Sequence, residues 1–378
     1  MKISATIPCL CLAFLFVIPI GCGTVRSVGK NPSGKNLRAL QGLPNYTADG
    51  FVNLSDAPPR RIYGSNNLAN NRNGILSKLR PLRMLKGKPD TVRPRNIIPI
   101  VKTDLLSLKS DKPTVVWFGH SCFLIKTKTA NILFDPELSS FAGPFSGPVN
   151  AFEGADAYTP EDMPPIDVLI VSHDHYDHLD YNTIKKLKKK VKKVVVPMGV
   201  GSHFTYWGYD KAKIQELNWG ESININPQLS ITAMPAHHRS GRTFTGNKTL
   251  WASYVIEVDG FKLFYSGDTG YSSHFKTIGE HFGPFDLAMM ECGQYNNNWW
   301  QNHMFPQQTV QAAADLKAKM ILPVHWGKFA EAYHRWNESI KTMLPVADNL
   351  KIPVTIPKIG EAYTVGDPPL QTNWWNVD

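Results

Sequence analysis

Six consecutive residues, His173-Asp174-His175-Tyr176-Asp177-His178, carry the clearest chemical signal in this sequence. They read H-x-H-x-D-H and follow a largely apolar run at residues 166–171. Such a run predicts a buried strand, and polar side chains at the end of a strand predict a site. Imidazole and carboxylate are ligands that zinc and similar divalent ions prefer. The segment therefore predicts a metal site.

Three further segments place metal-ligand side chains at the ends of predicted strands. These side chains are His238, Asp268 and His325, which follow apolar runs at residues 229–234, 261–265 and 320–322. A single histidine or a Gly-Asp-Thr-Gly turn is most often structural. Their recurrence after H-x-H-x-D-H changes that interpretation, because two metal ions about 3.5–4 Å apart need more imidazoles and a bridging carboxylate.

The elements that must position these residues fall into two similar halves. Strands are predicted at residues 114–118, 122–125, 131–134, 166–171, 194–196, 229–234, 251–258, 261–265, 287–290 and 320–322, and helices at residues 181–190, 306–317 and 330–343. In each half, strands come first and then alternate with helices. This order predicts two mixed β-sheets face to face with helices outside.

The whole pattern resembles the metallo-β-lactamase superfamily. It is most similar to the N-acyl-phosphatidylethanolamine-hydrolysing phospholipase D branch and its bacterial lactonase-like relatives. The similar segments are W-F-G-H-S at 117–121, L-F-D-P at 133–136, H-D-H-Y-D-H-L-D at 173–180, P-A-H-H-R-S-G-R at 235–242, S-G-D-T-G-Y at 266–271, and H-M-F-P with P-V-H-W-G-K-F between 303 and 329. The resemblance covers residues 111–345 and implies an α+β fold, the αββα sandwich.

The resemblance also implies a cofactor of two zinc ions with a shared ligand. One ion would be held by His173, His175 and His238, the other by Asp177, His178 and His325, and Asp268 would bridge them. Iron is less expected, because an oxidase-type site of this fold would carry a carboxylate in place of His175.

Further residues take roles from the same resemblance. Tyr176 and His303 match positions that contact the substrate in the phospholipases, and His120 and Asp135 match positions that orient ligand imidazoles. The sequence departs from the phospholipases at His237, where Gln or Arg is usual, and at residues 290–293, where small residues are common. Both departures concern the substrate and not the metals.

The expected activity is hydrolysis of a phosphodiester in a phospholipid, which would place the protein in lipid metabolism. A metal-bridging hydroxide would exist near neutral pH, and the ions would neutralise charge on the phosphate. Asp177 and Asp268 would act as catalytic ligands, and His303 would bind the phosphate or protonate the leaving group. Two alternatives stay open: a lactone or cyclic-phosphate hydrolase on a soluble substrate, and a non-catalytic metal-binding envelope protein.

The N-terminus predicts export. Lys2 precedes an apolar stretch at residues 7–20, which is short for a membrane span, and Gly-Cys-Gly follows. Residues 1–21 resemble a bacterial lipoprotein signal with Cys22 as the lipidated residue, although Pro19 stands where leucine is preferred. The expected location is the bacterial cell envelope, as a membrane-anchored lipoprotein or as a periplasmic or secreted protein.

Residues 22–110 predict a basic, loop-rich arm before a hydrolase domain at residues 111–378. The arm holds 16 Lys and Arg residues against 4 Asp and Glu residues. It would lie against an anionic phospholipid surface or serve as a solubilising segment. No recognition motif for nucleic acid accompanies the charge. The expected partners are a phospholipid or other phosphodiester, a membrane surface and, because family relatives form dimers, a second copy of the chain.

Overall fold

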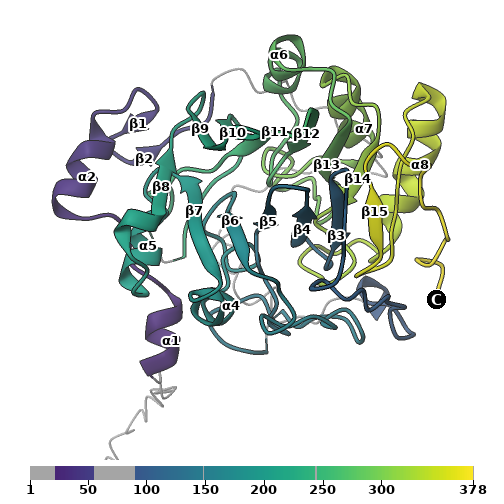
Figure 1. Cartoon of the computed structure of the whole chain (residues 1–378), viewed down its shortest axis with the longest axis horizontal. Coiled ribbons are helices and arrows are strands. Elements are labelled where there is room, and N and C mark those ends of the chain that lie inside the picture. The colour runs from purple at the N-terminus through teal and green to yellow at the C-terminus, as the bar shows by residue number, and fades with distance from the viewer. Residues whose placement is uncertain (1–21, 55–89, 148, 243–244, 378) are drawn as a thin grey trace, which may run out of the picture.

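Two mixed β-sheets form the centre of the structure (Figure 1), a computed structural model that describes residues 22–54, 90–147, 149–242 and 245–377. The first sheet has the strand order β15-β3-β4-β5-β6-β7-β8, antiparallel from β15 to β5 and parallel from β5 to β8. Its strands are β3 (Thr114–Trp117), β4 (Phe123–Lys126), β5 (Asn131–Phe134), β6 (Ile166–Ile170), β7 (Val191–Pro197), β8 (Ile214–Leu217) and β15 (Ala362–Thr364).

The second sheet repeats this arrangement with the order β14-β13-β12-β11-β10-β9. Its strands are β9 (Ser222–Asn226), β10 (Leu229–Met234), β11 (Ser253–Val258), β12 (Phe261–Tyr265), β13 (Leu287–Glu291) and β14 (Ile321–Val324). The strands from β9 to β12 are antiparallel, and those from β12 to β14 are parallel. Parallel strands require crossover connections, which are usually helices, and this accounts for the helices in the second part of each half.

Side chains alternate between two cores along the first sheet. Val115 and Trp117 of β3 face the second sheet, whereas Val116 between them packs in the outer layer with Ile184 of α4 (Tyr181–Leu187). The other described helices that cover the sheets are α5 (Gly201–Tyr206), α6 (His274–His281), α7 (Pro306–Asp315) and α8 (Glu338–Leu350). The predicted αββα sandwich is therefore confirmed.

Several expected boundaries and elements differ from the structure. The helix expected from residue 330 begins only at Glu338, because the backbone N–H groups of Glu331 and Ala332 donate to the Gln294 side chain instead of forming a helical turn. The helix expected at residues 181–190 ends at Leu187. Strands β8, β9 and β15 and helices α5 and α6 were not expected, since their apolar residues are few and irregularly spaced.

The described parts of the N-terminal arm lie on the domain and contain regular structure. They are helix α1 (Cys22–Ser27), helix α2 (Gly34–Gln41), the hairpin β1 (Tyr46–Thr47) and β2 (Gly50–Phe51), and the short 3-10 helix η2 (Asp90–Val92); a second 3-10 helix, η3 (Lys211–Lys213), precedes β8 in the domain. Leu40 and Phe51 of the arm pack against Leu250 and Trp251. The expected signal segment, residues 1–21, lies outside the described residues. None of the helices in the described ranges is both long and apolar enough to cross a membrane.

Candidate metal centre

The H-x-H-x-D-H segment forms a tight loop between β6 and α4. The backbone N–H groups of His178 and Leu179 both donate to the carbonyl oxygen of His175, at 3.2 and 2.8 Å. Asp180 then caps α4 by accepting hydrogen bonds from the backbone N–H groups of Asn182 and Thr183. This turn directs neighbouring side chains of the segment into one buried space.

The first cluster joins this loop to the end of β10. His173 Nε2 lies 2.8 Å from His175 Nδ1, and His238 Nε2 lies 3.3 Å from the same atom. Asp268 Oδ2 is 3.8 Å from His173 Nε2 and 3.7 Å from His238 Nε2. Three imidazoles and a carboxylate thus direct one atom each toward a common point.

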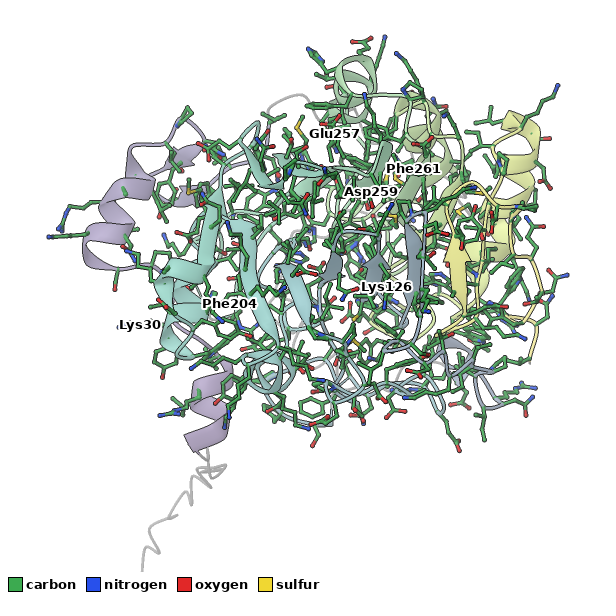
Figure 2. The ribbon with its side chains drawn as sticks, in the orientation of Figure 1. Lys30, Lys126, Phe204, Glu257, Asp259 and Phe261 are labelled. Atoms are coloured by element: carbon green, nitrogen blue, oxygen red, sulfur yellow. The ribbon has the colours of Figure 1, made fainter. Side chains whose placement is uncertain are left out.

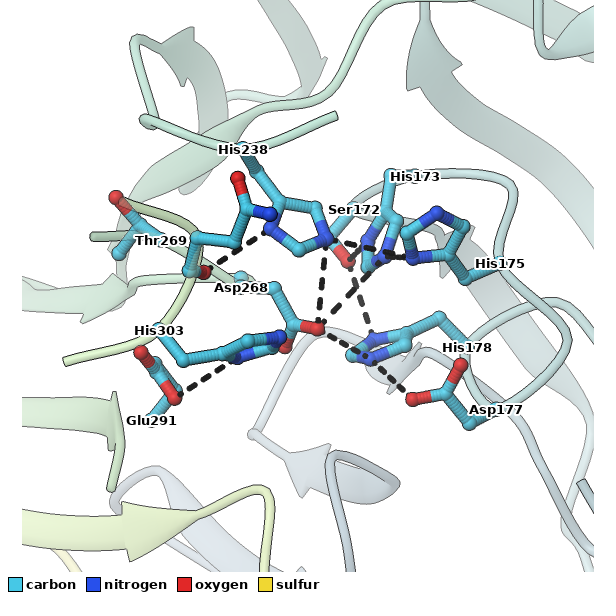
Figure 3. A network of polar contacts seen from close by, with 12 residues as sticks. Ser172, His173, His175, Asp177, His178, His238, Asp268, Thr269, Glu291 and His303 are labelled. Atoms are coloured by element: carbon cyan, nitrogen blue, oxygen red, sulfur yellow. Dashed lines mark hydrogen bonds and ion pairs between the residues drawn. The ribbon is translucent and has the colours of Figure 1, made fainter. Parts of the chain in front are cut away.

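The second cluster shares Asp268 with the first. His178 Nε2 and His325 Nε2 each lie 3.2 Å from Asp268 Oδ2, and they lie 3.1 and 3.5 Å from Asp177 Oδ2. Figure 3 shows the Asp268 carboxylate between the imidazoles of the two clusters. The structure therefore brings together all seven residues expected to ligate metal and places Asp268 where a bridging ligand would lie.

A strained turn after β12 presents Asp268. Gly267 has a φ of 55°, and a Cβ atom there would meet the carbonyl oxygen of Ala252 at 2.7 Å. The neighbouring Thr269 Oγ1 accepts a hydrogen bond from the backbone N–H of His237 at 2.8 Å. The His237 ring makes its own contact with the carbonyl oxygen of Gln301 and joins neither cluster.

Asp135 orients one of the candidate ligands. Its Oδ2 accepts a hydrogen bond from His178 Nδ1 at 2.6 Å and others from Ser172 Oγ and Tyr265 OH at 2.5 Å. With the proton on Nδ1, the lone pair of His178 Nε2 points toward Asp177 and Asp268. The geometry matches the orienting role implied for Asp135.

His120, which was expected only to orient a ligand, lies beside the candidate ligands themselves. Its Nε2 is 2.9 Å from Asp177 Oδ2, and its ring also lies within the second cluster, beside Asp177, His178 and His325. The His120 backbone also pairs with the late ligand loop, since it donates to Trp326 O and accepts from His325 N. His120, Asp135 and His325 have φ values of 51°, 37° and 67°, so backbone strain is concentrated here.

Charge is distributed unequally over the two clusters. Burial, the largest effect, lowers the pKa of His173 and His238 well below the usual histidine range, so these rings are neutral. Burial also lowers the pKa of His178 and His325, but the surrounding carboxylates, Asp268 first, raise it well above that range. Positive charge is therefore required beside Asp268, and a divalent cation would supply it in place of protons.

The buried polar atoms fit a bound cation. His178 Nε2, His325 Nε2 and Asp268 Oδ1 are buried and make no aligned hydrogen bond, although carboxylate oxygens lie close to both nitrogens. Unpaired buried polar atoms are costly. These nitrogen and oxygen atoms lie close together, but none donates a hydrogen bond to another. This is the arrangement of ligand atoms around a common ion. The residues present therefore fit the metals that the sequence predicts.

Glu291 is a site residue that the sequence analysis missed. It ends β13, is buried, and its Oε2 faces His303 Nδ1 at 3.6 Å and His325 Nδ1 at 3.7 Å (Figure 3). Its Oε1 accepts a hydrogen bond from the backbone N–H of Met304. A carboxylate at the end of an otherwise apolar, buried strand was the signal available in the sequence.

A cavity of about 530 Å³ opens onto both clusters. Tyr176 and His303, the expected substrate contacts, line it together with Arg239, Trp299 and Glu331. The Tyr176 hydroxyl donates a hydrogen bond to the Arg242 carbonyl oxygen. The part of Tyr176 that can contact a substrate is therefore mainly its ring. Burial, the largest effect, lowers the pKa of His303 to about 3, so its imidazole is neutral.

A larger cavity of about 790 Å³, at the β9–β10 and β11–β12 turns, contains none of these residues.

The chain is similar to several known proteins. Residues 130–326 match the family described as Beta-lactamase superfamily domain. An uncharacterized protein of Mycobacterium tuberculosis is 33% identical over 363 residues, which are 94% of this chain and 93% of that protein. The N-acyl-phosphatidylethanolamine-hydrolyzing phospholipase D, mitochondrial, of Saccharomyces cerevisiae is 37% identical over 224 residues, which are 56% of this chain and 47% of that protein. The structure of Igni18, a metallo hydrolase from Ignicoccus hospitalis, superposes with a TM-score of 0.51 at 21% identity, over 67% of this chain and 98% of that chain.

Proposed function

Because this chain belongs to the metallo-β-lactamase superfamily of metal-dependent hydrolases, we propose that it is a dinuclear zinc enzyme that hydrolyses a phosphodiester bond of a phospholipid. One observation carries this proposal. Asp268 Oδ2 lies within 3.8 Å of imidazole nitrogens from both clusters. A structural zinc site has four protein ligands, no open coordination position and no bridging carboxylate. A carboxylate shared by the two clusters therefore favours catalysis over a non-catalytic role.

Two zinc ions bound at the clusters would lower the pKa of a water molecule and neutralise charge that develops on a phosphate. The chain's own residues prepare that chemistry. Asp135 fixes the His178 ring, and the His120 ring holds Asp177 in place. His303 is neutral, so it would bind a phosphate oxygen through an N–H group, a role that fits better than protonating the leaving group.

The phospholipid substrate is supported by charge and by kinship. Arg239 lines the cavity beside the clusters and can pair with a phosphate oxygen, and Trp299 offers an apolar face at the same cavity. The yeast relative is named for its hydrolysis of N-acyl-phosphatidylethanolamine. A lipid anchor at Cys22 and a place in the cell envelope would bring the enzyme to such a substrate.

A soluble lactone or cyclic phosphate is the second candidate substrate. The cavity of about 530 Å³ falls within the range of pockets that enclose small molecules. Glu331 lines this cavity, and burial raises its pKa to about 8, so a neutral carboxyl group there would not repel an anionic or a neutral ester.

Elemental analysis of the purified protein, followed by a product screen, tests the proposal. We expect two zinc ions per chain and release of a phosphatidic acid from phospholipid vesicles. One metal ion per chain would contradict the dinuclear site. Turnover of soluble lactones or cyclic phosphates with no turnover of vesicles would reject the phospholipid in favour of the second candidate.

A further inference from the structure

A dense group of lysines covers α4 and the strand that follows it. Seven of the nine residues from 185 to 193 are lysines, and Lys185, Lys188 and Lys189 are exposed. The N-terminal arm, with 16 Lys and Arg residues against 4 Asp and Glu residues, is the other basic part of the chain. The folded domain therefore carries a second concentration of positive charge that its catalytic site does not use.

Part of this charge is unbalanced. Lys186 pairs with Glu161 at 3.2 Å, Lys192 pairs with Asp167 at 2.7 Å, and Lys190 donates to three backbone carbonyl groups. Within the described ranges, Lys185, Lys188 and Lys189 have no carboxylate partner. These three ammonium groups are thus available to an external anion.

A cavity lies at the end of α4 among these lysines. Its volume is about 420 Å³, and Lys188, Lys189 and Lys213 line it together with Asp210. Lys213 is itself held by a hydrogen bond to the carbonyl oxygen of Val191. Three ammonium groups against one carboxylate favour an anion such as a phosphate group in this cavity.

Helix α1, which begins at Cys22, lies beside α4 (Figure 1). The Trp207 indole connects the two, since its Nε1 donates to Arg26 O and its ring lies 5.4 Å from the ring of Tyr181, the first residue of α4. The expected point of lipid attachment is therefore at the same end of the molecule as the lysines. Figure 2 shows Lys30 and Phe204 at this end too, and the Lys30 backbone N–H donates to His203.

Large apolar side chains are exposed around α1. Val25 is 53% exposed on α1, and Tyr206 is 44% exposed beside Trp207. Phe145 is 50% exposed and follows Pro144, whose carbonyl oxygen accepts a hydrogen bond from Ser27 Oγ. Exposed apolar side chains next to unpaired lysines suit the boundary between lipid headgroups and acyl chains.

The buried Arg242 side chain connects α1 to a residue that lines the catalytic cavity. The Arg242 guanidinium donates to Ser27 O at the end of α1 and lies 4.0 Å over the ring of Tyr176. Tyr176 lines the catalytic cavity, and so does Ala142 from the loop that carries Phe145. A lipid held at this surface would therefore be close to the entrance of the cavity.

We propose that α1, α4 and the turn at residues 208–213 form a docking face for membranes that contain anionic phospholipids. Lys185, Lys188 and Lys189 bind lipid phosphate groups, while Val25 and Tyr206 enter the interface. The link between this face and substrate delivery rests on the proposed function. The docking itself does not.

Vesicle binding of the full chain tests the docking face. The triple variant K185Q/K188Q/K189Q is compared with K276Q/K341Q/K351Q, which removes the same charge from exposed lysines of α6 and the α8 region. Co-sedimentation is measured with vesicles of phosphatidylcholine alone and with added phosphatidylglycerol. The quantity compared is the ratio of the affinity for vesicles with phosphatidylglycerol to the affinity for vesicles of phosphatidylcholine alone. The apolar N-terminus contributes equally to both affinities, so its contribution cancels in this ratio.

We expect the wild type and the control variant to prefer the anionic vesicles by on the order of 100-fold, and the K185Q/K188Q/K189Q variant to lose most of that preference. The proposal is overturned if this variant keeps the preference at an unchanged melting temperature, if the wild type has none, or if duplex DNA binds the lysines more tightly than the vesicles do.

Hydrolysis of bis(4-nitrophenyl) phosphate separates this proposal from the enzymatic one. The lysine variant should retain wild-type turnover of this soluble ester, because its substitutions lie outside the metal centre. If the wild type hydrolyses no phosphodiester but still binds anionic vesicles through these lysines, the docking face stands and the proposed function fails.

Discussion

Asp268 connects the two candidate metal clusters through a single carboxylate oxygen. Replacing Asp268 with Asn removes the negative charge between the ions but keeps the shape of the side chain. We expect turnover to fall by about 10³-fold or more, because the loss of a bridging ligand costs several kcal/mol of charge stabilisation. The variant should still fold, since the apolar core is untouched.

Steady-state kinetics, metal analysis and thermal unfolding of D268N check this expectation. The matched control is Asp111→Asn, which changes an exposed aspartate that belongs to neither cluster. Full activity of D268N would contradict the dinuclear mechanism, and unfolding of D268N without metal would show that Asp268 is needed for the fold instead.

His203 is a buried histidine whose contacts require the neutral ring. Its Nδ1 accepts a hydrogen bond from the Lys30 backbone N–H, and its Nε2 lies 3.1 Å from Asp174 Oδ2. Burial, the largest effect, lowers the pKa of His203 below 6.5. Below pH 6.5 the unfolded chain therefore binds a proton that the folded chain excludes, and stability falls as the pH falls.

The variant His203→Gln removes this titration. We expect the slope of unfolding free energy against pH, just below pH 6.5, to decrease by up to about 1.4 kcal/mol per pH unit relative to the wild type. Urea unfolding of the metal-free protein at several pH values measures it, with the exposed His281→Gln as control. Equal slopes in the wild type and H203Q would mean that His203 is not held neutral.

At the scale of elements, the N-terminal arm supports the ligand loops from outside the matched domain. Asn53 Nδ2 donates to the backbone carbonyl oxygen of His238, and Asn53 Oδ1 accepts from the His238 N–H and from Trp251 Nε1. Arg242 likewise donates to Ser27 O of α1 and to Asp174 O and Leu179 O around the metal loop. The arm and both ligand loops therefore form one hydrogen-bonded unit.

Replacing Asn53 with Ala should loosen the loop that carries His238. We expect the affinity for zinc to fall about 10- to 100-fold, the usual effect of removing a group that supports a ligand. Competition with a chromogenic chelator measures it, and Asn36→Ala on the exposed side of α2 is the control. Unchanged zinc affinity in N53A would show that the arm packs on the domain without supporting the site.

At the scale of the whole molecule, the metal centre concentrates buried acidic side chains. Asp135, Asp177, Asp268 and Glu291 are each at most 8% exposed and lie around the same few imidazoles. Bound cations relieve the repulsion among such carboxylates, so metal binding and folding are coupled. The stability of the protein should therefore depend on its metal content.

Chelation tests this coupling. Removing zinc from the wild type should lower the free energy of unfolding by about 4 kcal/mol when free zinc had been near a thousand times its dissociation constant. Calorimetry with and without chelator measures the shift, and a chelator already saturated with zinc is the control. The shift should be smaller in D268N. An identical melting temperature in wild-type protein with and without zinc would contradict the coupling.

The residue types at the centre and their places at strand ends could be predicted from the amino-acid sequence. H-x-H-x-D-H, His238, Asp268 and His325 are readable because strand periodicity and ligand chemistry are local properties. Strands β10 and β12 begin and end where their apolar runs predict. Irregular segments such as residues 326–337 were not predictable, because the backbone there is held by Gln294, which lies more than thirty residues earlier.

The contacts between residues that are distant in the sequence are visible only in the folded chain. It placed Asp268 between the clusters, His120 against Asp177, Glu291 behind His303 and His325, and Asn53 on the loop of His238. These contacts join segments from opposite sheets and from the arm. They arise because both sheets and the arm bury their apolar faces against each other, and that burial is a property of the whole chain that no short stretch of sequence contains.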